Sequence, residues 1–139
     1  MGLLKFKKYY KKVKEIKTML KKSIKYTDYN GVERVEDFYF NLSKAEVAEM
    51  ELSVDGGMSV MLEKIVESKN NKEILAMFKQ IILKAYGEKS EDGKRFVKNE
   101  KISEGFAQTE AFSELFVELA LNEDKAAEFV KGILPGELR

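Results

Sequence analysis

The sequence predicts a mainly α protein of the α+β class, in which a small N-terminal β-hairpin is followed by a compact helical bundle of about five to six helices. Apolar residues recur at three- and four-residue steps through most of the chain, which is the spacing of one helix face. Asn30-Gly31 separates two runs rich in β-branched and aromatic residues, a strong signal for a hairpin. The 139 residues are 44% hydrophobic, enough for a folded core.

Residues 1–21 are predicted to form a basic amphipathic N-terminal helix, and residues 22–139 the main domain. Lysines surround an apolar stripe along this segment. Residues 1–25 hold ten lysines and one glutamate, whereas the rest of the chain is acidic. Three interpretations stay open. The helix packs on the acidic body or in a coiled coil, it binds an acidic partner or a membrane surface, or it precedes a native start at Met19.

The hairpin is expected to have strands at residues 23–29 and 32–40. Its Asn-Gly pair favours a type I′ turn, in which both central residues have positive φ. The rings of Phe38, Tyr39 and Phe40 would alternate between the two faces. The hairpin then either rests on helices or offers an edge strand to a partner strand.

Ser43 and Glu46 have capping-box spacing and predict a helix start. A second helix is expected over residues 58–66. A third is expected over residues 71–86, capped by Asn71 and closed by a left-handed Gly87. Residues 90–93 read as a turn.

The last third of the chain is predicted to be helical. One helix contains Ile102 and Phe106, and Thr109 and Asn122 each cap another. Gly132 and Pro135 would end the last helix. Short connections favour antiparallel neighbouring helices.

Composition argues against most enzyme chemistry. The chain has no histidine and no cysteine, so the commonest general base, the commonest metal ligand and the thiolate nucleophile are all missing. Residues 55–57 read as a turn rather than a phosphate or calcium loop, and the carboxylates of Glu46, Glu49 and Glu51 as a solvated helix face. We therefore expect no enzyme activity, no catalytic residue, no cofactor and no metal site.

No membrane span is expected, because no apolar run approaches 18 residues. Nucleic-acid binding is not favoured, because the acidic body would repel phosphate.

Methionine and phenylalanine side chains suggest an adaptable apolar groove for a partner helix. The expected partner-binding residues lie in the hairpin and in three of the helices: Phe38, Phe40, Met50, Met58, Met61, Phe112 and Phe116.

Three segments carry a resemblance to a known family: "YTDYNGVERVEDFYFNLSKAEVAEMEL", "LKAYGEKSEDGKRFVKN" and "TEAFSELFVELALNEDKAAEFVKGILP". Together with the helices between them, they resemble the tail assembly chaperones of long-tailed, siphovirus-type bacteriophages and prophages of Gram-positive bacteria, over roughly residues 22–135. Members of this family look as if they start a few residues before the first segment, as this chain would from Met19. The eighteen residues before Met19 depart from the family pattern.

The resemblance implies a non-catalytic chaperone of virion morphogenesis that acts by protein–protein interaction. It would bind the tape measure protein, keep it soluble and help recruit the tail tube (major tail) protein. It would act in the host cytoplasm and be absent from the mature virion. A frameshifted longer form of the chain is a further implied partner. The alternative is a small helical adaptor or regulator whose basic N-terminal arm binds nucleic acid or an acidic partner.

Overall fold

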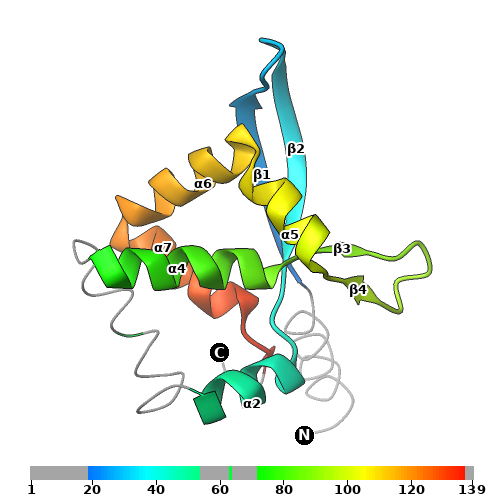
Figure 1. Cartoon of the computed structure of the whole chain (residues 1–139), viewed down its shortest axis with the longest axis vertical. Helices are drawn as coiled ribbons and strands as arrows, with labels where there is room; N and C mark the ends of the chain where they lie inside the picture. Colours follow the sequence, from blue (N-terminus) through cyan, green and yellow to red (C-terminus); the bar gives the residue numbers. More distant parts are fainter. Residues whose placement is uncertain (1–18, 54–62, 64–71, 137–139) are drawn as a thin grey trace, which may run out of the picture.

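The computed structural model describes residues 19–53, 63 and 72–136, which form five helices and a four-stranded antiparallel sheet (Figure 1). In chain order the elements are β1 (Leu20–Thr27), β2 (Glu33–Phe40), α2 (Lys44–Ser53), α4 (Lys72–Ala85), β3 (Tyr86–Lys89), β4 (Phe96–Val97), α5 (Glu100–Ala107), α6 (Glu110–Ala120) and α7 (Glu123–Ile133). The mainly helical α+β fold is confirmed. The sheet, however, has two more strands than the sequence predicted.

Several predictions fall outside the described residues. They include most of the N-terminal helix, the helix over residues 58–66 and the Asn71 cap. At the end of the predicted basic segment, Leu20 and Lys21 lie in β1.

β1 and β2 form a long antiparallel hairpin that projects from the helices (Figure 1). Its turn differs from the predicted type I′. Gly31 has a φ of 81°. Asn30 lacks the positive φ that a type I′ turn also requires, because only glycines have a positive φ among the described residues. The Gly31 N–H donates to the Asp28 carbonyl and the Asp28 N–H to the Val32 carbonyl, each at 2.9 Å, which is a type I turn with a glycine bulge. The Asp28 carboxylate selects this turn by accepting the N–H groups of Asn30 and Val32.

β3 and β4 form a second, short hairpin closed by the expected turn at residues 90–93, with Gly93 at a φ of 73°. The prediction for Gly87 was wrong, because this residue lies in β3 and has no positive φ. A Cβ atom there would lie 2.8 Å from the Phe96 ring. Gly87 therefore allows a close approach between side chain and backbone rather than a helix cap.

The helix starts follow the sequence signals closely. The Ser43 hydroxyl accepts the Glu46 N–H at 3.1 Å while Glu46 accepts the Ser43 N–H at 2.9 Å, which confirms the capping box. Thr109 and Asn122 cap α6 and α7 as predicted. Asn99, which sequence reasoning missed, caps α5 in the same way.

The end of the last helix needs a small correction. Gly132 does not end α7, which continues to Ile133 before Pro135. Instead, a Cβ atom at Gly132 would lie 3.0 Å from the side chain of Leu20. The glycine thus lets β1 approach the last turn of α7 closely.

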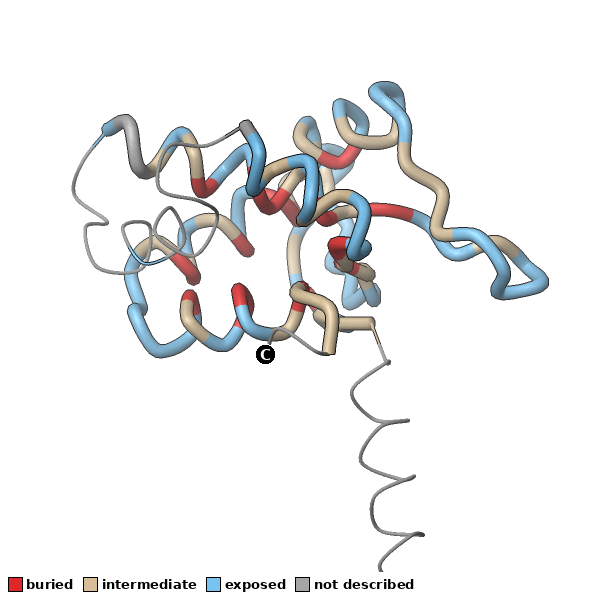
Figure 2. The backbone as a smooth tube through the Cα atoms, turned by 90° about the horizontal axis from the view of Figure 1, so that it is seen from below, coloured by how far each residue is buried: buried red, intermediate tan, exposed pale blue. Residues whose placement is uncertain are grey.

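The core lies between the inner face of the hairpin and the helices. Buried positions lie on the facing sides of neighbouring segments, whereas exposed positions face outward (Figure 2). Inner-face residues Ile24 and Phe40 are buried, whereas outer-face residues Lys25 and Val35 are exposed. The sheet is therefore covered on one side, as is common for antiparallel sheets.

Candidate functional site

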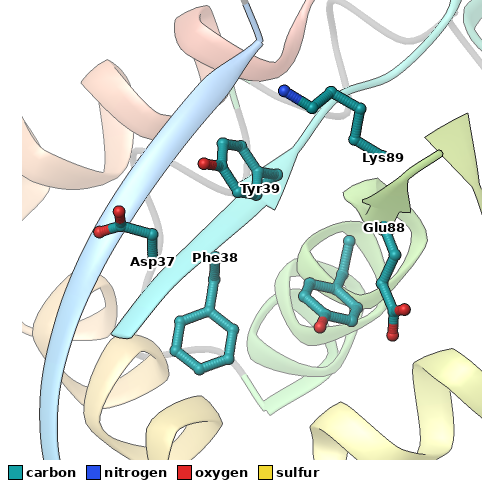
Figure 3. A pocket seen from close by; sticks show the side chains of 7 residues that line it. Asp37, Phe38, Tyr39, Glu88 and Lys89 are labelled. Atoms are coloured by element: carbon teal, nitrogen blue, oxygen red, sulfur yellow. The ribbon is translucent and has the colours of Figure 1, made fainter. Parts of the chain in front are cut away.

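The first candidate surface is a cleft at the point where β2 and β3 separate. The two strands pair only at Tyr39 with Gly87 and at Phe40 with Tyr86. Beyond these pairs β2 continues along the projecting hairpin while β3 turns away with β4 (Figure 1). The cleft has a volume of about 290 Å³ and is lined by Asp37, Phe38, Tyr39, Tyr86, Gly87, Glu88 and Lys89 (Figure 3).

Aromatic rings line the cleft on both faces of the sheet. Phe38 points toward the helices, where its ring centroid lies 6.3 Å from that of Tyr86 and 5.3 Å from that of Phe106. Tyr86 stacks on Phe106 with centroids 4.1 Å apart, and burial raises the pKa of its hydroxyl. These contacts hold the Phe38 and Tyr86 rings in place.

On the opposite face, Tyr39 lies beneath the Lys89 ammonium, which is 5.9 Å from the ring centroid (Figure 3). The carboxylates of Asp37 and Glu88 lie at the rim of the cleft. The cleft thus combines an apolar lining with a mostly acidic rim.

The backbone of β2 is open along the edge that leads into this cleft. Because Asp28 and Val32 are a hydrogen-bonded pair, the residues that bond to β1 alternate along β2 from Arg34 onward. Glu33, Val35 and Asp37 direct their N–H and C=O groups to the other edge. β3 reaches that edge only at Tyr39, so these three residues have no strand partner within the described part of the chain.

A second candidate surface runs along the outer side of α6. We call it the α6 stripe: Glu110, Glu114, Val117, Glu118 and Leu121, which follow one another at helical spacing. Val117 is 52% exposed, and Leu121, which caps the helix, is 76% exposed. The stripe offers two apolar side chains beside three carboxylates, and the Glu118 carboxylate pairs with Lys125 at 3.0 Å.

The tip of the hairpin contacts the start of this stripe. The Glu110 carboxylate lies near the Tyr29 hydroxyl and raises its pKa. Tyr29 is itself largely exposed, so this contact brings the hairpin tip and the start of α6 together at the surface.

The predicted partner-binding residues fall into three groups. Phe40 and Phe112 lie in the core, so their rings offer no surface to a partner in this conformation. Phe38 lines the cleft, and the side chains of Met50 and Phe116 are half-buried against the core. Met58 and Met61 lie outside the described residues.

Sequence reasoning missed the two exposed apolar residues of the α6 stripe. The sequence prediction named Phe112 and Phe116 on this helix as partner-binding residues, whereas Phe112, Leu115 and Leu119 form its buried face. Val117 and Leu121 lie outside that buried face and are four residues apart, so they share a second face of the helix. This apolar pair on a second face was the signal that could have identified them.

An ion pair fastens the β4–α5 connection to the start of α2. The Lys98 ammonium donates to both oxygens of Glu46 at 2.8 Å and to the Asn41 carbonyl at 2.6 Å. Burial alone would raise the pKa of Glu46, but hydrogen bonds from Lys98 and Ser43 lower it below its ordinary value. The pair is therefore structural, and Glu46 serves as cap and counter-ion rather than as a solvated acid.

Metal binding and membrane insertion each require a feature that can be checked in the described residues. No group of three or more acidic side chains among them is placed to hold a metal ion. Their helices are all too short or too polar to span a membrane. The two surfaces above are suited to holding another polypeptide.

Comparison with known proteins identifies the family. A family model described as phage tail assembly chaperone matches residues 19–139. Neither the search of curated proteins nor that of solved structures gave a match. Because the family match covers most of the chain, including every described element, the chain belongs to the phage tail assembly chaperone family.

Proposed function

We propose that this chaperone binds the tape measure protein of a siphovirus-type phage or prophage of a Gram-positive host. It keeps that long helical protein soluble and helps to recruit the tail tube protein before the tube polymerises. The protein works in the host cytoplasm, makes or breaks no covalent bond and leaves before the virion matures. A frameshifted longer form of the chain would share this role.

The α6 stripe is the observation that carries this proposal. A helical partner places apolar side chains at i, i+3, i+4 and i+7, and Val117 and Leu121 form a matching pair on the chaperone. The carboxylates beside them, of which Glu118 already pairs with Lys125, favour a partner helix whose apolar face is flanked by lysine or arginine.

The small apolar area of the α6 stripe also suits a chaperone that must release its partner. Two exposed apolar residues bury little area, so binding at one such stripe stays reversible. A long partner would gain affinity by engaging many chaperone copies, each held weakly.

A pull-down from cells that co-express the tape measure protein tests this assignment. We expect Val117→Lys together with Leu121→Lys to remove most of the captured tape measure protein, because two charges would replace the apolar contact. Both side chains are exposed, so the fold should survive, and circular dichroism checks this.

Leu52→Lys is the matched control, because Leu52 is 90% exposed but lies on α2, away from the stripe. This control should capture as much partner as the wild type. Equal capture by the α6 double variant and the wild type would contradict the assignment of the stripe.

A further inference from the structure

We propose that the open edge of β2 binds an extended peptide segment of a partner as an added strand, and that this segment carries a basic–x–apolar–x–basic pattern. The site consists of Glu33, Val35 and Asp37 and ends in the cleft beside Tyr39. It lies apart from the α6 stripe and does not depend on how a tape measure helix is bound.

The backbone supplies the binding groups. Glu33, Val35 and Asp37 each direct one N–H and one C=O away from β1, and no described strand accepts them. Natural proteins often place charges on such an edge to limit indiscriminate pairing, and here Glu33 and Asp37 make the edge selective for a basic strand. The edge continues for five residues and ends at the cleft, where β2 and β3 separate and the end of another strand can enter.

The side chains define the peptide that fits. The outer-face side chains along this edge are Glu33, Val35 and Asp37, and Val35 is 67% exposed. Neither carboxylate has an ion-pair partner among the described residues. A strand added beside β2 would place its own side chains opposite these three, so lysine or arginine fits at both ends and an apolar residue fits in the middle.

Arg34, within the edge itself, is held by Asp28 and Glu36, and the cations on the neighbouring strands oppose this pairing only weakly. Lys25 lies on β1, so an added strand would be two strand spacings, about 10 Å, away from it. That distance is close to the Debye length at physiological salt. Lys89 is held over the Tyr39 ring at the end of the site. The acidic side chains of β2 are therefore the first charges that an added strand would meet.

A fluorescein-labelled peptide, Thr-Lys-Thr-Val-Thr-Lys-Thr, provides the test by fluorescence anisotropy with the full chain. Its pattern reads the same in both directions, so it fits either strand orientation. We expect saturable binding that weakens with added salt. A peptide with glutamate in place of both lysines should bind at least about tenfold more weakly.

Two proline variants locate the site. Val35→Pro removes an N–H that points to the open edge, and it leaves the β1–β2 hydrogen bonds in place. Ser23→Pro does the same on the opposite edge of the hairpin, because Ser23 pairs with Asp37 and directs its N–H away from β2. Neither change alters the charge, and circular dichroism would check that both variants fold.

Peptide binding should fall at least about tenfold in Val35→Pro and stay unchanged in Ser23→Pro. The proposal would be overturned by absence of binding to the wild type, by equal binding to Val35→Pro, or by equal binding of the glutamate peptide. Gel filtration adds one more outcome. A wild-type dimer that Val35→Pro dissociates would show that a second copy occupies the edge, and the peptide proposal would be wrong.

Discussion

Replacing Phe40 with alanine tests whether the aromatic end of β2 belongs to the core. The side chain is 0% exposed. Its ring centroid lies 5.2 Å from that of Phe129, 5.7 Å from that of Phe106 and 5.7 Å from that of Tyr86. One ring therefore joins β2 to β3, α5 and α7.

The magnitude follows from these contacts. A buried phenylalanine replaced by alanine costs about 3–5 kcal/mol, and ring pairs of this kind contribute about 0.5–1.5 kcal/mol each beyond the buried area. With three such pairs around Phe40, we expect a loss of about 4 kcal/mol, a large part of the roughly 5–15 kcal/mol that a domain has in total. Urea unfolding followed by far-UV circular dichroism measures this free energy.

Val117→Ala is the control, because this half-exposed residue lies outside the core and should change stability by no more than about 0.5 kcal/mol. A loss below about 1 kcal/mol for Phe40→Ala would refute the reasoning. If such a stable Phe40→Ala variant also failed to capture the tape measure protein in the pull-down, Phe40 would be a binding residue, as the sequence had suggested.

Three other substitutions test local features. Gly31→Val should destabilise the hairpin by about 1–2 kcal/mol in the same urea assay, because a β-branched residue resists a φ of 81°; unchanged stability would contradict the turn. Gly87→Ala should cost about 1 kcal/mol, since the half-exposed Phe96 ring must shift, and a neutral result would show that this approach is looser than described. Lys98→Met should cost about 1–3 kcal/mol at neutral pH, because it leaves the Glu46 carboxylate without its counter-ion. The lowered pKa of Glu46 means that the wild type loses this contribution as pH falls below about 4.5; the difference between wild type and variant should therefore shrink in acid, and a constant difference would contradict the ion pair.

Local signals predicted the helix starts well because a cap depends on a few neighbouring residues. Ser43 with Glu46, Thr109 and Asn122 each satisfy backbone N–H groups within one turn, so short sequence spacing was sufficient. The hairpin was predicted for the same reason. Its turn type was missed because the Asp28 side chain takes part in it.

The second hairpin was missed because its strands are short and depend on tertiary contacts. Tyr86 continues the apolar spacing of α4, so its pattern alone is that of a helix. Pairing with Phe40, and the close approach of Phe96 to Gly87, convert this segment into a strand.

The candidate surfaces could be predicted only in part. Aromatic residues such as Phe40 and Phe112 have the same sequence signature in a core and in a binding groove, so burial had to come from the structure. The sequence left open whether the hairpin rests on helices or offers an edge strand to a partner strand, and the structure shows its inner face packed on the helices. The location of its open edge followed only from the register of β2 against both neighbours.

The solubility of the tape measure protein tests the central claim most directly. The tape measure protein would be expressed alone, with this chain, and with the variant carrying Val117→Lys and Leu121→Lys, and its fraction in the supernatant measured at equal expression. We expect the wild-type chain to raise that fraction several-fold and the double variant to leave it near the level without chaperone. An equal soluble fraction with and without the wild-type chain would contradict the claim.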